Sequence, residues 1–519
     1  MARKSASSKA KPPPSDSDSQ NSTDVATQQQ GKDKPRGTIV FFHPDLGIGG
    51  AERLVVDAAV GLQERGFRVV IFTNHCDPSH CFDECRDGTL DVRVRAAGPV
   101  PMSILNRFTI LCAILRHLQL LITIAITGEL YSLRPDAFIA DQLSAGLPLL
   151  ANLYPAAPIL FYCHFPDLHL ALGRDASLIK RLYRRPFDTL ERWSMGYSTS
   201  IAVNSDFTRR VVNGTWPGLE DQKPMRVVYP CVDTRAKAAA SEDDEGDSEP
   251  VLDGDKIILS INRFEGKKDI GLAIKAFAAI PTDKREGARL VLAGGYDARI
   301  GENVRVLSEL RSLADSLSLG HATVSSSDSL SSAPLTSEAP VLFLPSVSSA
   351  SKAAILEASR LLVYTPAAEH FGIVPIEAML ARVPVLAATT GGPVESVQDG
   401  ITGWLRSTLD TPAWTDVMTR ALSLSKKERK KMGDAGARRV EELFSRDGMA
   451  RRFEAILAEM LAQPRVPVES TFFGRVIELG AMVVIMAVAF GFGLLIAHFY
   501  YPVRHSVNNM LGFTKKKDT

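Results

Sequence analysis

Two glutamates eight residues apart, Glu369 and Glu377, are the first candidates for chemistry. They flank the stretch EHFGIVPIE, which follows the apolar run LLVYT (361–365) and contains a glycine and a proline. Ligands of open α/β sheets bind beyond the carboxyl ends of the strands, where a loop carboxylate and a carboxylate on the next helical turn could both accept hydrogen bonds from sugar hydroxyls. The alternative is structural: Glu377 would be an acid stabilised by the helix dipole, and Glu369 a solvated loop residue.

A basic turn follows another apolar run, KIILSI (256–261). Its sequence, NRFEGKK, places Arg263 and Lys268 five residues apart at the end of a predicted strand. Two fixed cations there could neutralise a diphosphate leaving group, as a metal ion does in other folds. A solvated basic turn is the structural alternative.

A glycine cluster, Gly47, Gly49 and Gly50, lies between the predicted strand TIVFFH (38–43) and a predicted helix. Glycines allow backbone N–H groups to approach a phosphate at a helix N-terminus. The cluster departs from the dinucleotide fingerprint GxGxxG, because Glu52 stands where the third glycine is expected. A tight turn without a ligand explains it equally well.

His164 follows the predicted strand ILFYC (159–163), in the stretch CHFPD. A histidine at the end of a strand that faces a cleft is suited to contact a reacting sugar. The alternative is a histidine that only stabilises its loop.

We expect no metal site. The DxD patterns at 16–18 and 253–255 fall in a polar tail and a linker, so we interpret them as incidental. The region around residue 80 is dense in possible zinc ligands, but their spacing is not that of a standard zinc finger. These ligands are His75, Cys76, His80, Cys81 and Cys85.

Short apolar runs alternate with helical patterns along the chain, which predicts an α/β fold with parallel sheets. Further strands are expected at RVVIFT (68–73), AFIA (137–140), SIAV (200–203), RLVLAG (289–294) and VPVLAA (383–388). We divide the chain into a disordered tail (1–36), a first Rossmann-like domain (37–235), an acidic linker (236–254), a second Rossmann-like domain (255–465), a hydrophobic membrane segment (472–497) and a basic tail (498–519). The serine-rich stretch 314–338 is expected to hold a surface loop.

The composition of the 519 residues is that of a globular protein. Apolar residues make up 45% and charged residues 23%, as in globular proteins, and the net charge is +1. This balance does not suggest a nucleic-acid partner. The N-terminus has no apolar stretch of a signal peptide, so we expect the six cysteines to be reduced thiols.

Two stretches are candidates for contact with lipid. Residues 479–497 carry no charge over 19 residues, which is about the length that crosses a bilayer. Residues 108–127 are also apolar but contain Arg116, His117 and Gln119. This second stretch could span the membrane, lie on its surface or be buried, and we favour an interfacial helix.

Together, the motifs resemble the retaining glycosyltransferases of family 4, which have the GT-B fold. The matching stretches are GIGGAER, YCHFPD, INRFEGKKD, EHFGIVPIEAMLA and TTGGPVE, and the Glu369–Glu377 pair is similar to the family's E-x7-E motif. The resemblance covers about residues 38–460. It implies two facing Rossmann-like domains with a cleft between them.

The resemblance also implies roles for individual residues. Arg263 and Lys268 would hold the donor diphosphate, Glu369 the transferred sugar and Glu377 the nucleotide ribose. Gly391 and Gly392 would help to cradle the phosphates, while Gly49 and Gly50 would close the crevice from the first domain. His164 would lie near the reacting carbon or the acceptor hydroxyl. No side chain is then an obligatory nucleophile, and catalysis is mainly positioning and charge stabilisation.

Finer stretches, among them HPDLGIGGAERLVVDAA and YCHFPDLHLA, resemble the family members that mannosylate the dolichol-linked oligosaccharide at the endoplasmic reticulum. That implies GDP-mannose as the donor, mannosyl-chitobiosyl-diphosphodolichol as the acceptor, and α-1,3 and α-1,6 linkages as products. No cofactor is obligatory, and other enzymes of the pathway are possible partners. Two alternatives remain: another family 4 transferase, using GDP-mannose at a later step or UDP-N-acetylglucosamine, and a non-catalytic scaffold.

The membrane path is left open by two opposing signals. The chain ends in KKDT, which resembles a dilysine signal read in the cytosol, and basic residues are denser after the apolar segment than before it. A single span would then place the catalytic domains in the lumen, away from a cytosolic sugar-nucleotide pool. A hairpin bent at Gly491-Phe492-Gly493, a second span at 108–127 or an incidental KKDT resolves the conflict. We expect catalysis on the cytosolic face.

Overall fold

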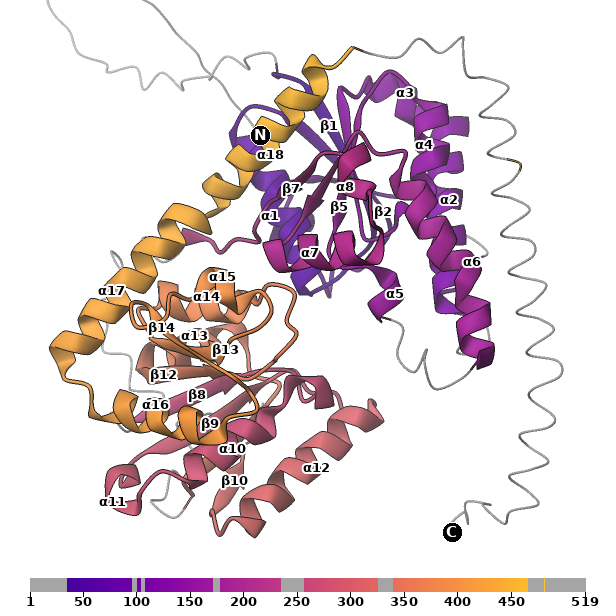
Figure 1. Cartoon of the computed structure of the whole chain (residues 1–519). Coiled ribbons are helices and arrows are strands. Elements are labelled where there is room, and N and C mark those ends of the chain that lie inside the picture. Colours follow the sequence, from indigo (N-terminus) through magenta and orange to yellow (C-terminus); the bar gives the residue numbers. More distant parts are fainter. Residues whose placement is uncertain are drawn as a thin grey trace, which may run out of the picture. The chain divides into compact units, whose positions relative to one another are not determined.

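Buried runs of aliphatic and aromatic residues form the strands of two parallel sheets (Figure 1). The computed structural model of the protein describes residues 35–95, 100–103, 108–170, 178–234, 256–324, 339–464 and 480, without the side chains of 178–183 and 349. The predictions for residues 1–34, for the acidic linker 236–254 and for 472–519 other than Gly480 lie outside the described residues.

The first sheet has the strand order β3-β2-β1-β4-β5-β6-β7, with every pairing parallel. Its strands are β1 (Thr38–Leu46), β2 (Arg68–Cys76), β3 (Asp91–Val94), β4 (Ala137–Asp141), β5 (Ile159–Cys163), β6 (Ser200–Val203) and β7 (Met225–Val227). The helices and turns between them are α1 (Gly50–Glu64), η1 (Asp83–Cys85), α2 (Thr109–Ile126), α3 (Glu129–Leu133), η2 (Ser144–Gly146), α4 (Leu147–Leu153), α5 (Asp167–Leu170), α6 (Leu178–Met195), α7 (Asp206–Thr215) and α8 (Leu219–Gln222).

The second sheet repeats the plan in the order β10-β11-β9-β8-β12-β13-β14, again all parallel. Its strands are β8 (Ile257–Ile261), β9 (Arg289–Gly294), β10 (His321–Thr323), β11 (Val341–Pro345), β12 (Ser359–Tyr364), β13 (Val385–Ala388) and β14 (Gly403–Arg406). Its helices are η3 (Gly266–Lys268), α10 (Ile270–Ala278), α11 (Thr282–Arg285), α12 (Gly301–Ser316), α13 (Ser349–Ala358), α14 (Ile373–Leu380), α15 (Pro393–Ser396), α16 (Thr411–Ser423), α17 (Lys426–Leu443) and α18 (Arg446–Ala462). The predicted pair of Rossmann-like α/β sheets is confirmed.

Helix α18 departs from the predicted domain boundary. The sequence placed residues 255–465 in the second domain, but the apolar face of α18 packs against α1 and completes the core of the first sheet. The buried side chains that it contributes are Met449, Phe453, Ile456, Leu457 and Met460. Local pattern shows that a helix has an apolar stripe, but not which sheet that stripe covers.

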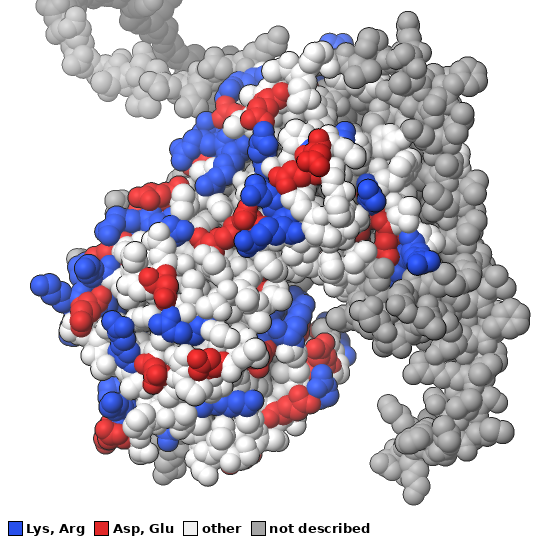
Figure 2. Space-filling model, viewed as in Figure 1, with Lys and Arg blue, Asp and Glu red and all other residues white. Residues whose placement is uncertain are grey.

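Ion pairs reinforce this packing at the surface. Arg65 lies between Glu454 and Asp447 of α18, and Arg36 also contacts Glu454. On the face shown in Figure 2, basic side chains are interspersed with acidic ones. Because such pairs are partly exposed, each contributes little to stability beside the apolar contacts beneath them.

In the serine-rich stretch 314–338, where a surface loop is expected, the described residues 314–324 include regular structure. Helix α12 continues to Ser316, and β10 pairs with β11 from His321 to Thr323. The remaining residues, 325–338, lie outside the described part of the chain. Serine is common in loops, but buried partners at Ala314 and Leu319 hold this segment in regular structure.

Helix α2 carries apolar side chains on two faces. One face is buried against the first sheet through Leu120, Leu121 and Ile124, while Ile122 and Ile126 remain 45% and 81% exposed on the other. Within the described residues it is the one helix long and apolar enough to cross a membrane by length and composition, a test that buried core helices also pass. The predicted interfacial location therefore stays a prediction.

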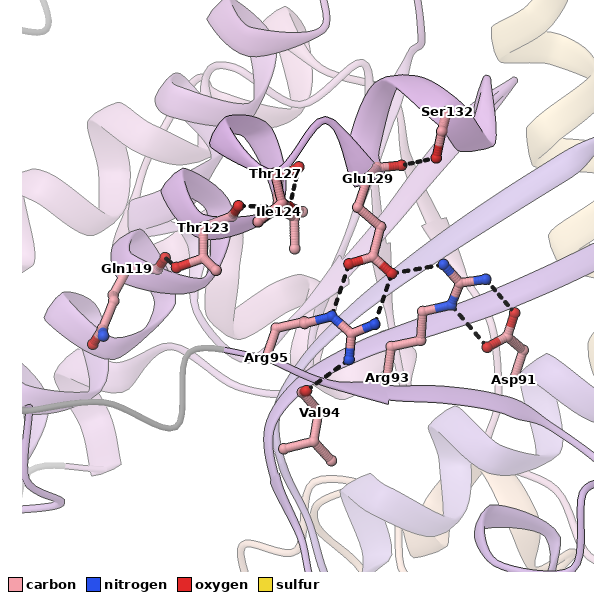
Figure 3. Close-up of polar contacts among 10 residues, drawn as sticks. All are labelled: Asp91, Arg93, Val94, Arg95, Gln119, Thr123, Ile124, Thr127, Glu129 and Ser132. Carbon is pink, nitrogen blue, oxygen red and sulfur yellow. Dashed lines mark hydrogen bonds and ion pairs between the residues drawn. The ribbon is translucent and has the colours of Figure 1, made fainter.

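An ion cluster fixes the segment that follows α2 (Figure 3). Glu129, at the start of α3, accepts hydrogen bonds from Arg93 and Arg95 of the β3 strand region at 2.7 Å each, and Arg93 also contacts Asp91 at 2.8 Å. Two cations thus face two carboxylates. The cluster is close to neutral, and it attaches the end of α2 firmly to the edge of the sheet.

Candidate functional site

Lys268 and Glu369 meet at the carboxyl ends of β8 and β12. The Lys268 ammonium lies 2.5 Å from Glu369 Oε2, and the Tyr364 hydroxyl donates to the same oxygen at 3.0 Å. Burial alone would raise the pKa of Glu369, but Lys268 and Tyr364 outweigh it and lower that pKa. The Glu369 carboxylate is therefore ionised at neutral pH, and Lys268 is held where a second anion could share it.

The turn that carries Arg263 and Lys268 is shaped by close backbone contact. Gly294 has φ +146°, and a Cβ there would lie 2.0 Å from the carbonyl oxygen of Asn262. This approach fixes the start of the turn. Arg263 projects away from it: its side chain is 65% exposed and pairs with Glu265 at 3.1 Å. The structure thus brings Lys268 to Glu369 but leaves Arg263 facing solvent, free to swing onto a ligand.

Gly391 and Gly392 support the Glu369 loop directly. The Gly392 N–H donates to the carbonyl oxygen of Glu369 at 2.8 Å. A Cβ on Gly391, which has φ +77°, would lie 2.6 Å from that same oxygen, and one on Gly392 would lie 2.2 Å from Phe371 Cα. Glycine is needed at both positions because the Glu369 backbone passes so closely. This packing is a different reason for the two glycines from the phosphate cradle that the resemblance implied, which no contact tests.

Replacing Gly391 by alanine should therefore damage the site as well as the fold. We expect a loss of about 3 kcal/mol of stability, from left-handed backbone strain and from the clash with Glu369. Gly400→Ala is the matched control, because Gly400 has φ +75° and nothing within 4 Å of its Cβ position. It should cost only about 1 kcal/mol. Thermal unfolding and transfer rates of the two variants test this, and equal effects would contradict it.

Glu377, on α14, lies next to a cavity of about 480 Å³. Its carboxylate is paired with Lys352 of α13 at 2.6 Å. The other walls include Arg53 of α1, Leu356 of α13 and Ile373 of α14. Cavities of roughly 300–1,000 Å³ are the usual size for small-molecule ligands. Apolar and charged side chains both line this cavity, a mixture that suits a flat ring attached to a polar sugar.

His164 joins a buried polar chain that the sequence did not reveal. Its Nε2 lies 2.8 Å from Asp141 Oδ2, and His43 Nδ1 lies 2.8 Å from Asp141 Oδ1. Burial would raise the pKa of Asp141, but the two histidines lower it to about 2. The carboxylate is therefore an anion that accepts hydrogen bonds from the two imidazole rings.

The His164 loop is connected to the Glu369 loop. The rings of Phe165 and His370 stack with centroids 3.7 Å apart, and Ser205 Oγ donates to the His370 carbonyl oxygen at 2.5 Å. Burial lowers the pKa of His370 to about 4, so this ring is neutral at pH 7. The carboxylate of Glu395 also accepts two hydrogen bonds of 2.8 Å from the N–H groups that begin α7. The two loops that carry His164 and Glu369 thus lie next to each other.

Gly49 and Gly50 stand at the N-terminus of α1, as predicted. Gly49 is the N-cap residue, and a Cβ there would lie within 2.3 Å of Glu52 Oε2. A Cβ on Gly50 would lie 3.7 Å from Ile373 of α14, so the glycine loop approaches the second sheet closely. Among the described residues, no three His, Cys, Asp or Glu side chains converge as metal ligands.

Two acidic residues, Asp167 and Glu191, interact at the end of the His164 loop. Glu191 accepts a hydrogen bond from the Asp167 N–H at 2.9 Å. Burial raises the pKa of Asp167, and the charge of Asp188 adds to that rise. Burial, followed by the charge of Asp167, raises the pKa of Glu191 to about 8. At neutral pH Glu191 is therefore mostly protonated in the folded protein.

The free energy of unfolding should fall as the pH rises from 4.5 to about 8. Between the ordinary pKa of 4.5 and about 8, folded Glu191 holds a proton that the unfolded chain has lost. The folded state thus binds more protons in this window, and its advantage disappears as the pH approaches 8. We expect Glu191→Gln to reduce the loss by about 2 kcal/mol between pH 5 and pH 8. Unfolding temperatures at several pH values test this; identical pH slopes for both proteins would contradict it.

Four contributing residues were missed from the sequence: His43, Asp141, Tyr364 and Lys352. Asp141 follows the predicted strand AFIA, so the rule that selected His164 would have selected it too. His43 and Tyr364 end predicted strands, but both were counted as part of an apolar run. Lys352 gives no local signal, because its helix reaches Glu377 only in the folded chain.

Two parallel sheets with charged side chains at their strand ends are typical of glycosyltransferases with two Rossmann-like domains, and comparison with known proteins shows that the chain is of this class. Residues 48–236 match the family described as Glycosyltransferase Family 4, and residues 242–439 match glycosyl transferases group 1. Solved structures with similar folds include sucrose-phosphate synthase from Thermosynechococcus elongatus (TM-score 0.60, 19% identity) and Anabaena HepE in complex with UDP and glucose (TM-score 0.56, 17% identity). Each covers 82% of this chain and 100% of its own, and shows the fold alone.

Curated relatives narrow the class. The alpha-1,3/1,6-mannosyltransferase alg-2 of Neurospora crassa is 54% identical over 432 residues, which span 82% of this chain and 92% of that protein. The alpha-1,3/1,6-mannosyltransferase ALG2 of Saccharomyces cerevisiae is 41% identical over 434 residues, spanning 81% and 84%. The chain belongs to glycosyltransferase family 4 and, within it, to the family of the alpha-1,3/1,6-mannosyltransferases. Membership implies a nucleotide-sugar donor.

Proposed function

We propose that this protein transfers mannose from GDP-mannose to mannosyl-chitobiosyl-diphosphodolichol, adding one α-1,3 and one α-1,6 mannose during N-glycan precursor synthesis. The observation that carries the proposal is the Lys268–Glu369 pair, held at adjacent strand ends beside the loop of His164, in a chain 41–54% identical to mannosyltransferases of that linkage specificity. The identity of the acceptor and the nucleobase rests on the resemblance.

The positions of the described groups support one orientation of the proposed donor. Its nucleoside would occupy the cavity of about 480 Å³, where Glu377 can accept hydrogen bonds from the ribose hydroxyls. The diphosphate would lie toward Lys268, with the exposed Arg263 closing on it, and the N-terminus of α1 at Gly49–Gly50 would face the same charge. The mannose would then reach Glu369 and His164.

The chemistry follows from this placement. Departure of the diphosphate builds negative charge that Lys268 and Arg263 stabilise, and positive charge on the sugar ring that the Glu369 carboxylate stabilises. The acceptor hydroxyl would attack from the face that the diphosphate leaves, with a phosphate oxygen taking the proton and the configuration at the anomeric carbon retained. Two cations, Lys268 held at Glu369 and Arg263 free to close on the ligand, would serve where other folds use a metal.

We further propose that the protein works at the endoplasmic reticulum membrane with its catalytic domains in the cytosol. The acceptor would be presented at the bilayer surface, and the exposed face of α2 suits an interfacial position there. All six cysteines are free thiols in the structure, which fits a reducing compartment.

The activity is tested by purifying the full chain in lipid and supplying GDP-mannose with a lipid-linked monomannosyl chitobiose. We expect two mannoses to be added, one in each linkage, as resolved by mass and linkage analysis. Turnover only with a longer mannosyl acceptor or with a UDP-sugar would keep the family and reject the proposed substrates. Absence of turnover with every donor would favour the scaffold.

The α2 face gives a separate prediction. Ile122→Asp with Ile126→Asp should slow transfer to an acceptor in vesicles by about 10-fold, because each change removes an apolar side chain worth roughly 1.5–3 kcal/mol on burial. Transfer to a short-chain acceptor dispersed in detergent should be unchanged. Ser132→Asp, on exposed α3, is the control for added charge. Equal rates on vesicles for all three proteins would remove α2 from the lipid contact.

A further inference from the structure

Three polar side chains cross the first sheet near the carboxyl ends of its central strands. His43 lies within β1, one residue past the last β1 residue that pairs with β4. Asp141 ends β4, and His164 follows β5, the next strand along. Their contacts are continuous: His43 Nδ1 to Asp141 Oδ1 at 2.8 Å, and His164 Nε2 to Asp141 Oδ2 at 2.8 Å. His43 and Asp141 are each 2% exposed, whereas the His164 side chain is 19% exposed and reaches the surface of the site.

The surroundings of His43 indicate which of its atoms matters. Its Nδ1 has the partner described above, whereas its Nε2 is buried and has no hydrogen-bond partner among the described residues. A buried polar atom without a partner destabilises the fold, so histidine is a poor choice at this position for packing alone. The choice is explained if the Nδ1–H bond to Asp141 has a function.

Further contacts hold His164, at the exposed end of this row of three side chains, rigidly in place. The ring of Tyr162 packs against that of His164 with centroids 4.8 Å apart, and Asn204 Nδ2 donates to the His164 carbonyl oxygen at 2.8 Å. The remaining freedom of the imidazole is rotation about its own axis and the choice of protonated nitrogen. The hydrogen bond to Asp141 fixes both the ring orientation and the protonated nitrogen, provided that the Asp141 carboxylate itself cannot rotate.

We propose that His43 is a positioning residue for mannose transfer: its Nδ1–H locks the Asp141 carboxylate, which holds the Nε2–H of His164 and leaves His164 Nδ1 as the hydrogen-bond acceptor. This inference rests on the proposed role of His164 beside the reacting sugar. His43 touches no substrate. It acts through Asp141, by keeping one tautomer and one ring orientation of His164 ready for a hydroxyl of the donor or acceptor.

Two amide variants of similar polarity separate this role from simple packing. His43→Asn places an amide N–H close to the position of Nδ1–H, whereas His43→Gln places it near Nε2, away from Asp141. We expect the Asn variant to keep kcat within about 5-fold and the Gln variant to lose about 100-fold, with the donor KM little changed in both. In ¹⁵N-histidine spectra, the His164 signals should show the Nε2–H tautomer in the native protein and the Asn variant, and a mixture in the Gln variant.

His117→Asn is the matched control, since His117 is a second buried histidine of the same domain whose Nδ1 also lacks a described partner. It should lower the unfolding temperature and leave kcat unchanged. The inference is overturned if His43→Gln keeps both kcat and the His164 tautomer, or if the Asn and Gln variants lose activity equally. If His164→Asn kept full kcat, the proposed role of His164 would be rejected instead. If His164→Asn were inactive while His43→Gln stayed active, only the role of His43 would be rejected.

Discussion

Lys268→Ala is expected to lower kcat/KM for mannose transfer by about 1,000-fold, which is the scale of losing one preorganised group opposite developing charge. Lys268 is the described cation in contact with Glu369, at 2.5 Å, and the diphosphate is proposed to leave beside it. The neighbouring Lys267 is the matched control. Its side chain is 66% exposed and pairs with Glu265, so Lys267→Ala should stay within about 3-fold of the native rate.

Steady-state rates with GDP-mannose measure both variants, and thermal unfolding shows how much folded enzyme is present. Removing Lys268 also leaves Glu369 buried without its cation, so a lower unfolding temperature is expected. The assignment fails if the rate falls only in proportion to the loss of folded protein. It also fails if Lys267→Ala is as damaging as Lys268→Ala, because the effect would then reflect the charge of the turn as a whole.

Glu369→Gln should lower kcat by at least about 100-fold while changing the donor KM little. The amide keeps the size of the side chain and one acceptor for Tyr364, but it loses the negative charge that faces the sugar ring as positive charge develops there. Glu377→Gln is the contrasting variant. Glu377 is proposed to hold the ribose, which does not change during the reaction, so its loss should raise the donor KM by about 10-fold and spare kcat.

Kinetics over a range of GDP-mannose concentrations separate the two effects. If Glu369→Gln raised KM alone, Glu369 would be a ground-state contact and the sugar would lie elsewhere. If both glutamine variants behaved as the native enzyme, the E-x7-E pair would have only the structural roles that its helix position and loop suggest.

Strand ends were the part of the site that the sequence could predict. His164, Arg263, Lys268 and Glu369 each follow a short apolar run, and parallel strands present such residues at one edge of a sheet. What the sequence could not supply was the partner of each residue. Asp141 and His43 are 98 positions apart and meet only because β1 and β4 pair in register. Lys352 reaches Glu377 through the packing of two helices, which no local pattern records.

The glycines show the same division between local and distant information. The Gly49–Gly50 loop was identified by its place before an amphipathic helix, which is local. Gly391 and Gly392 are needed because the backbone of a loop some 20 residues earlier passes so close to them that a Cβ methyl group would clash with it. The family resemblance implied glycines near a phosphate, which stays a prediction, and the structure adds that they hold the Glu369 loop in place.

The packing of α18 on the first sheet has a consequence for how the chain is made. The first core contains residues from Ile39 to Met460, so it is incomplete until nearly the whole polypeptide has been synthesised. Until then α1 exposes the apolar face that Phe453, Ile456 and Leu457 later cover. A chain that stops after α17 would keep both sheets but leave this face open to solvent. Domains usually fold in order as they emerge, whereas here the first domain must wait for α18. Premature termination near the end of the coding sequence is therefore expected to yield a chaperone-dependent, aggregation-prone protein, even though all the proposed catalytic residues are present.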